Sequence, residues 1–108
     1  MVSVELLEEA RTALSELPRL IVVRLEGLLD RLRHWPDVSG VKYLRGKLAG
    51  RCRLRTGDYR LQFHVQEKKR TLREKRHVKG REVLQEKEVT DFVIIVEKIG
   101  HRDGFYEE

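Results

Sequence analysis

The chain has 108 residues, 38% of them charged, and a formal net charge of +5. This length suits one domain with a modest core and excludes two domains. The single cysteine excludes an internal disulfide and the usual multi-cysteine zinc site. No apolar run approaches the length of a membrane span, and no signal-peptide pattern follows Met1, so we expect a cytoplasmic protein without a membrane partner.

Positive charge is concentrated in the middle of the chain. Residues 42–60 carry seven basic residues and one acidic residue, a net charge of +6. Residues 66–88 carry nine basic and five acidic residues, a net charge of +4, whereas residues 1–37 and 89–108 are net negative. Such a distribution favours a polyanion as partner, because clustered charge of one sign attracts its opposite.

The N-terminal third predicts a short strand followed by two helices. Residues 2–6 are expected to form the strand, and apolar residues recur at helical spacing over residues 7–17, where Pro18 separates the two helices. The stripe of the second helix is Ile21, Leu25, Leu28, Leu32 and Trp35, and Pro36 ends it. We expect this helix to pack against a sheet, the alternative being a partner-binding helix. In the loop of residues 36–47, Tyr43 and Leu44 are expected to anchor the chain on the core.

Residues 44–65 predict a β-hairpin with its turn at Thr56-Gly57-Asp58. Side chains alternate between the faces of a strand, so each strand has one apolar and one polar side. The polar side consists of Arg51, Arg53 and Arg55 from the first strand and Arg60, Gln62 and His64 from the second. Clustered guanidinium groups repel one another but bind phosphate well, so this face is expected to meet phosphate; the alternative is a solvated charged face. Cys52 lies on the apolar side, where we expect a small buried residue.

The segment 66–88 is highly charged and shows no sustained hydrophobic period. Folding the chain at Lys79-Gly80, near its centre, places Phe63 opposite Val96. The segment is then a long ribbon that projects from the domain; the alternative is a mobile charged loop. Residues 92–96, apolar at every position, predict a central strand buried on both faces.

The chemistry on offer comes from arginines, histidines and tyrosine. No cluster of acidic residues and histidines has the spacing of a metal site, so neither a metal nor a cofactor is predicted. RNA carries its own nucleophile, the ribose 2′-hydroxyl. A protein that aligns this oxygen with the neighbouring phosphate needs cations for the transition state and one or two groups that move protons. The candidate groups are Arg51, Arg53, Arg55, Arg60, His64, His101, Arg102 and Tyr106, and Lys42, Arg45 and Lys47 extend the positive surface.

Three motifs follow one another in a characteristic order. They are Leu44-Arg45-Gly46, the run RCRLRTGDYR at residues 51–60, and Ile99-Gly100-His101-Arg102 followed by Tyr106. This ordered set resembles the RelE/ParE superfamily of toxins from type II toxin–antitoxin systems, and in particular its RelE-like mRNA interferase branch. The resemblance covers nearly the whole chain apart from about residues 66–88.

The resemblance implies an α+β fold in which two N-terminal helices pack on one face of a small, mainly antiparallel four-stranded sheet. Residues 1–108 are then a single domain with a charged hairpin or loop inserted at about 66–88, and the free, concave face of the sheet binds RNA. The implied activity is that of a metal-independent endoribonuclease that cleaves mRNA on the ribosome by attack of the 2′-hydroxyl on the adjacent phosphate. The implied partners are mRNA, the ribosome and a cognate antitoxin, the last held in a hetero-oligomer.

The resemblance also implies roles for single residues. Arg51 and Arg53 fall where RelE-like members have lysines, one of them proposed as general base, and Arg60 falls on an arginine that stabilises the transition state. Arg102 falls on an arginine proposed to assist the leaving group, and Tyr106 on a tyrosine that stacks on or positions the nucleotide. Arginine does not deprotonate near neutral pH, so Arg51 is a poor base, and His101 is the alternative for proton transfer. The RNA-binding set is Lys42, Arg45, Lys47, Arg55 and His64.

Two other functions stay open from the sequence. A ParE-like member with the same fold is a non-enzymatic poison of DNA gyrase, and a catalytically silent relative binds RNA without cleaving it. The combination of Arg53, Arg60, Arg102 and Tyr106 favours the ribonuclease over the gyrase poison.

Overall fold

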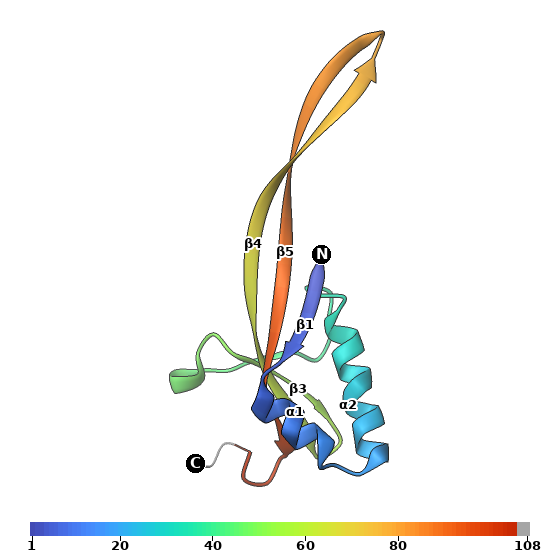
Figure 1. The fold of residues 1–108 in the computed structure, drawn as a ribbon. Coiled ribbons are helices and arrows are strands. Elements are labelled where there is room, and N and C mark those ends of the chain that lie inside the picture. The colour runs from blue at the N-terminus through green and yellow to red at the C-terminus, as the bar shows by residue number, and fades with distance from the viewer. Residues whose placement is uncertain (106–108) are drawn as a thin grey trace.

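A computed structural model describes residues 1–105, which form two α-helices, one short 3₁₀ helix and a five-stranded mixed sheet (Figure 1). The elements in chain order are β1 (Val2–Leu6), α1 (Glu8–Ser15), α2 (Arg19–Leu32), β2 (Lys42–Tyr43), the 3₁₀ helix (Gly46–Leu48), β3 (Cys52–Thr56), β4 (Tyr59–Val78) and β5 (Arg81–His101). This α+β arrangement confirms the predicted fold class. No helix in the described range is both long and apolar enough to cross a membrane.

The strands of the sheet lie in the order β1-β5-β4-β3-β2. β1 pairs with β5 in parallel, and the other three pairings are antiparallel. β5 is therefore flanked on both sides within the domain, as its apolar sequence predicts. Four strands were expected, and the fifth is β2, a two-residue edge strand in which Lys42 pairs with Arg53 and Tyr43 with Cys52.

Both helices cover the same face of the sheet, which we call the helix face. Pro18 stands at the N-cap of α2, as expected from its position between the helices. The apolar stripe of α2 faces inward, and the ring of Trp35 meets that of Phe63 edge-on at 5.7 Å between centroids. The buried core consists of Ala10, Leu25, Leu28, Leu32, Cys52, Leu54, Leu61, Phe63, Ile94, Val96 and Ile99. Helix packing against the sheet is thus confirmed.

The alternation predicted for the hairpin is also confirmed. Cys52 and Leu54 of β3 and Leu61 and Phe63 of β4 are buried under the helices. The arginines between them lie on the opposite face, and Gly57 supplies the positive φ of the turn at +57°. The expectation for Tyr43 is wrong, because its side chain is 67% exposed at the sheet edge.

A β-bulge interrupts the pairing of β4 with β5. Phe63 pairs with Val96 but Gln62 pairs with Lys98, so Glu97 is the extra residue in β5. Without the bulge Lys98 would face Leu61 under the helices, where an unpaired ammonium group is costly. With it, Ile99 takes this place and is 5% exposed. The bulge therefore exchanges a charged residue for an apolar one in the core.

Beyond the domain β4 and β5 continue as a twisted two-stranded arm, defined as residues 67–91 (Figure 1). The arm closes at Lys79-Gly80, whose φ angles of 52° and 74° suit a two-residue hairpin turn. It extends the molecule to 64 × 33 × 24 Å. The segment 66–88 is thus a projecting ribbon rather than a loop, and Phe63 lies opposite Val96 as predicted.

Candidate functional site

The free face of the sheet gathers most of the predicted functional residues, and we call it the arginine face. Its side chains come from alternate positions of β3 and β4: Arg51 (just before β3), Arg53, Arg55, Arg60, Gln62 and His64. Arg53 pairs with Gln62, which in turn pairs with Lys98, and Lys42 flanks Arg53 on the other side. One row across four strands thus carries three cations around the buried Gln62.

Arg60 has the most constrained environment on this face. It pairs directly with Arg55 on one side and with Gly100 on the other. Like charges directly opposite each other in a sheet are destabilising, so this pair costs the fold stability. The Nε atom of Arg60 is buried and has no hydrogen-bond partner among residues 1–105. A buried guanidinium nitrogen without a partner is rare in proteins, and a phosphate oxygen is a group that can accept a hydrogen bond from it.

A second cluster on the arginine face joins Arg51, Glu97 and His64. The carboxylate of Glu97 accepts a hydrogen bond from Arg51 Nε at 3.1 Å and lies 3.1 Å from His64 Nδ1. The other ring nitrogen of His64, Nε2, is 3.5 Å from the amide nitrogen of Gln66. Ala49, Gly50, Arg51, His64 and Val65 line a pocket of about 240 Å³ beside this cluster. The carboxylate therefore orients the imidazole at the edge of a space that admits a ligand.

Sequence reasoning missed Glu97 and Lys98. Alternation along β5 already puts Glu97 on the arginine face, whereas Lys98 reaches that face only because of the bulge. Lys98 lies on the arginine face opposite Gln62, and its Nζ donates to the Phe105 carbonyl and sits 4.8 Å from the centre of the Phe105 ring. It thus ties the C-terminal turn to the sheet. The signal was present in the sequence: two successive charged residues, Glu97-Lys98, break an otherwise apolar strand.

The structure does not bring His101 together with this cluster. His101 pairs with Tyr59, and their rings meet edge-on at 5.3 Å, so His101 shares the side of Tyr59 rather than that of Arg60. Its Nδ1 accepts a hydrogen bond from the Asp103 backbone at 3.1 Å. Arg102 lies beside the β3–β4 turn: its backbone N–H donates to the Asp58 carbonyl at 2.7 Å, and its Nε is 3.6 Å from the Asp58 carboxylate. Tyr106 lies outside the described residues.

The remaining predicted RNA-binding residues lie in β2 and on the segment that joins β2 to β3. Lys42, Arg45 and Lys47 are all exposed, and this segment stands away from α2 (Figure 1). The residues Val41–Arg45 line a larger open hollow of about 770 Å³. The ring of Tyr43 is exposed next to Lys42 in sequence, and an exposed ring is a platform on which a base can stack.

The single thiol and the acidic side chains complete the inventory of reactive groups. Burial raises the pKa of the Cys52 thiol, and Cys52 lies on the helix face, so it is a core residue as predicted and not a nucleophile. Within residues 1–105, no group of three or more His, Cys, Asp and Glu side chains is arranged to hold a metal ion.

Comparison with known proteins bears on the fold. No protein-family model matches the sequence, and no curated protein sequence matches it. A chain in the crystal structure of the toxin–antitoxin complex RelBE2 from Mycobacterium tuberculosis has a similar structure, with a TM-score of 0.60 and 22% sequence identity. The match covers 93% of this chain and 96% of that chain. The RelE-like fold expected from the sequence motifs is thus confirmed.

Proposed function

We propose that this protein is the toxin of a type II toxin–antitoxin pair and cleaves mRNA on the ribosome. The observation that carries the proposal is the Nε of Arg60, buried without a hydrogen-bond partner, on a face where Glu97 also orients a histidine. A bound phosphate accepts the hydrogen bond that Arg60 can donate, and the histidine transfers a proton. The fold shared with a chain of RelBE2 supports the toxin assignment, and a cognate antitoxin is the proposed partner in a hetero-oligomer.

The proposed reaction needs only the RNA and side chains of this face. The 2′-oxygen attacks the adjacent phosphorus, the bond from phosphorus to the 5′-oxygen breaks, and a cyclic 2′,3′-phosphate forms. Arg60 and Arg53 stabilise the charge that builds on the phosphoryl oxygens in the transition state. Arg102, at the turn end of the sheet, stabilises the negative charge on the departing 5′-oxygen, which takes its proton from water, and Tyr106 positions the nucleotide. Lys42, Arg45, Lys47 and Arg55 hold the flanking phosphates.

His64 is assigned the proton transfer from the 2′-hydroxyl. Arg51 keeps its charge near neutral pH and is paired with Glu97, so it serves as a cation and not as the base. A histidine held by a carboxylate through one ring nitrogen presents the other nitrogen in a fixed direction, as in hydrolases that use such pairs. Since His101 lies on the side of Tyr59, the proposal assigns it no role at the phosphate.

The cleavage test uses ribosomes programmed with a defined mRNA and reads the ends of the products by primer extension. The wild-type protein should cut, and Arg60→Ala should cut about 100 to 1,000 times more slowly, the usual cost of losing one transition-state donor. Arg24→Ala, the same change at an exposed position of α2, is the matched control and should cut normally. Absence of cleavage by the wild-type protein, with inhibition of gyrase supercoiling instead, overturns the ribonuclease assignment.

The proton-transfer assignment has its own test. His64→Gln should lower the cleavage rate by about 100-fold or more and remove a histidine ionisation from the pH–rate profile. Glu97→Gln should lower the rate less, because it misorients the imidazole without removing it. His101→Gln and His34→Gln should leave the profile unchanged. A profile altered by His101→Gln and not by His64→Gln reverses the assignment.

Metal independence is tested at the scissile phosphate. Replacement of a nonbridging oxygen by sulfur weakens Mg²⁺ coordination, and a thiophilic ion such as Mn²⁺ restores it. We expect equal cleavage of the sulfur-substituted mRNA with and without Mn²⁺ at constant Mg²⁺. Rescue by Mn²⁺ shows a catalytic metal and contradicts this part of the proposal.

A further inference from the structure

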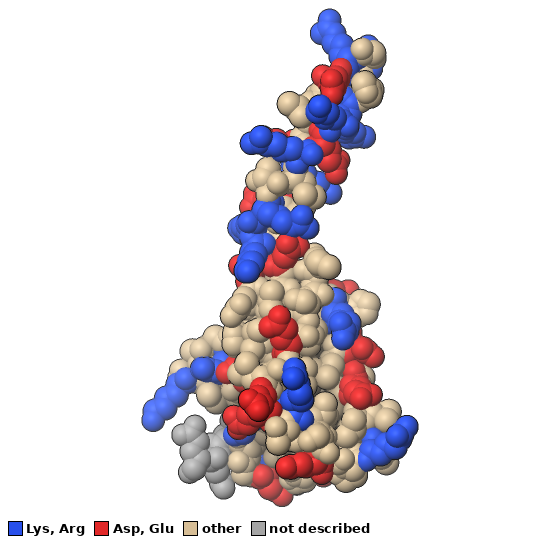
Figure 2. Space-filling view, in the orientation of Figure 1, with Lys and Arg blue, Asp and Glu red and all other residues tan. Residues whose placement is uncertain are grey.

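The arm has two chemically different faces. Paired residues of β4 and β5 share a face, and the residues that continue the arginine face are the even positions of β4 with their partners in β5. On this face the arm carries five basic and two acidic residues, a net charge of +3. The opposite face carries three basic and four acidic residues, a net charge of −1. Lys and Arg side chains are visible along the whole arm (Figure 2).

The basic residues on the positive face form what we call the basic stripe: Lys68, Arg70, Arg76, Arg81 and Lys87. In the described part of the chain only Arg70 of this set has an acidic partner; Arg76 donates to the neutral amide of Gln85. On the opposite face, Arg73 pairs with Glu86 at 3.3 Å and Lys75 with Glu82 at 3.4 Å. Two of the three cations on the opposite face are therefore paired with acidic residues of the arm, whereas four of the five stripe cations have no acidic partner among residues 1–105.

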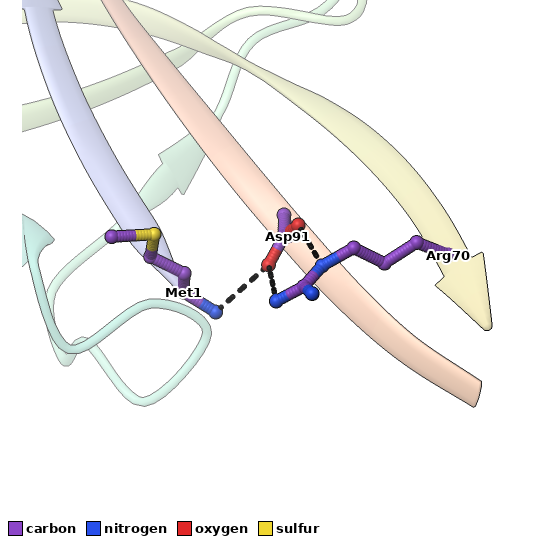
Figure 3. Close-up of polar contacts among 3 residues, drawn as sticks. All are labelled: Met1, Arg70 and Asp91. Carbon is purple, nitrogen blue, oxygen red and sulfur yellow. Dashed lines mark hydrogen bonds and ion pairs between the residues drawn. The ribbon is translucent and has the colours of Figure 1, made fainter. Parts of the chain in front are cut away.

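The root of the arm is fixed to the domain. Asp91 accepts a hydrogen bond from Arg70 Nε at 2.7 Å and lies 3.2 Å from the amino group of Met1 (Figure 3). Next to it, β1 pairs with Phe92–Val96 of β5. These contacts keep the first residue pairs of the arm in register with the sheet. The stripe therefore begins directly after His64 and Gln66 on the arginine face.

The residue composition of the arm indicates which kind of RNA, single-stranded or double-helical, it is suited to bind. Proteins that hold single-stranded RNA stack its bases on aromatic rings, and residues 67–91 contain no Phe, Tyr or Trp. Double-helical RNA hides its bases and is recognised through phosphates, 2′-hydroxyls and shape. The twelve residues from Glu67 to Val78 span about 40 Å, and the ribbon twists along this length (Figure 1), so the stripe is long enough to reach several successive phosphates.

We propose that the arm binds double-helical RNA through the basic stripe, which anchors the protein on the folded RNA of the ribosome beside the message that the arginine face cleaves. This inference rests on the proposed function for the choice of RNA over DNA. The contacts are made to phosphates, and the near-neutral face of the ribbon points away from the duplex.

The test measures binding of the full-length protein to a blunt RNA duplex of about 20 base pairs between about 50 and 200 mM salt. The stripe variant combines Lys68→Gln, Arg81→Gln and Lys87→Gln. The control variant combines Lys69→Gln, Arg73→Gln and Lys75→Gln, which removes the same charge from the opposite face. All six residues are exposed on the arm, so both variants should keep the thermal unfolding of the domain.

We expect the stripe variant to bind the duplex about tenfold or more weakly, with a log–log salt slope reduced by about 0.9 for each phosphate that is no longer neutralised. The control should bind within about twofold of the wild-type protein. Equal losses of affinity in both variants, or no loss in either, would contradict the proposal that the basic stripe binds the duplex. Equal affinity for a DNA duplex of the same sequence, or preference for polyglutamate, overturns RNA as the partner.

Failure of this inference is separable from failure of the proposed function. Arg60→Ala should bind the RNA duplex like the wild-type protein although it cleaves mRNA far more slowly. If the wild-type protein binds the duplex through the stripe but cuts no mRNA, the proposal for the arm stands and the nuclease proposal is contradicted. If the wild-type protein cuts mRNA but the stripe variant binds the duplex normally, only the proposal for the arm is contradicted.

Discussion

Strands β4 and β5 each run through two environments, the domain and the arm, and only their backbone pairing is common to both. In the domain Phe63, Ile94 and Val96 are fully buried beneath the helices. In the arm the pairing continues to Lys79-Gly80, yet nearly all side chains are exposed, including Leu84 at 68%. A hairpin with so little burial is marginal in isolation, so the arm depends on the domain for its order and the domain owes little to the arm.

The two regions should differ most in how much stability is lost when a large apolar side chain is truncated. Phe63→Ala should lower the free energy of unfolding by about 3–5 kcal/mol, because it removes a fully buried ring that also meets Trp35. Leu84→Ala in the arm should change it by less than about 0.5 kcal/mol. Denaturant unfolding of the two variants measures both. Similar values would mean that the arm is packed against something in solution.

The next largest effect concerns register. Deletion of Glu97 and Lys98 together removes the bulge, moves Ile99 from the core to a position opposite Gln62 on the arginine face, and should cost at least about 1.5–3 kcal/mol from the lost burial of Ile99 alone. Deletion of Glu88, in the exposed arm, also shifts the register but should leave the unfolding free energy of the domain nearly unchanged. If both deletions are tolerated equally, the bulge has no role in core formation.

A smaller effect is expected from shortening the arm. Replacement of residues 71–88 by Asn-Gly retains the pairs up to Arg70–Val89 and the contacts of Asp91. We expect the domain to unfold cooperatively and within about 1 kcal/mol of the full-length protein, because a connection changes the closure entropy only slightly. Loss of the cooperative melt would place the segment in the folding core. In the same variant, single-stranded RNA binding by the arginine face should persist, with a salt slope of about 0.7 per phosphate contact.

The smallest effect is the pH dependence at the arm root. The hydrogen bond from Arg70, followed by that from the Met1 amino group, lowers the pKa of Asp91. A carboxyl with a lowered pKa in the folded state adds stability above its unfolded pKa of about 3.9, and this stability is lost as the pH falls through the folded pKa. Asp91→Asn should therefore be slightly less stable than the wild-type protein at pH 7 and equal to it in strong acid. A difference independent of pH would contradict this role.

Much of the fold was predictable because local rules governed it. Apolar spacing marked both helices, and Pro18 marked the boundary between them. Gly57 marked the hairpin turn, and strict alternation separated the arginines from Cys52, Leu54 and Leu61. The same alternation, counted back from a turn at Lys79-Gly80, placed Phe63 opposite Val96. Tyr43 was misplaced because its exposure depends on an edge strand of two residues that carries no periodic signal.

The sequence by itself determined which side chains share a face, since side-chain direction follows from local backbone geometry. Only the tertiary structure decided where that rule is broken. Continued from Ile95 without interruption, alternation would put His101 on the arginine face, but the bulge at Glu97 shifts it to the side of Tyr59. The reason is energetic and lies between segments: β5 gains an extra residue so that Ile99 packs beneath the helices and Lys98 does not. The contact of the Glu97 carboxylate with His64, 33 positions away in the chain, likewise depends on the pairing of β4 with β5.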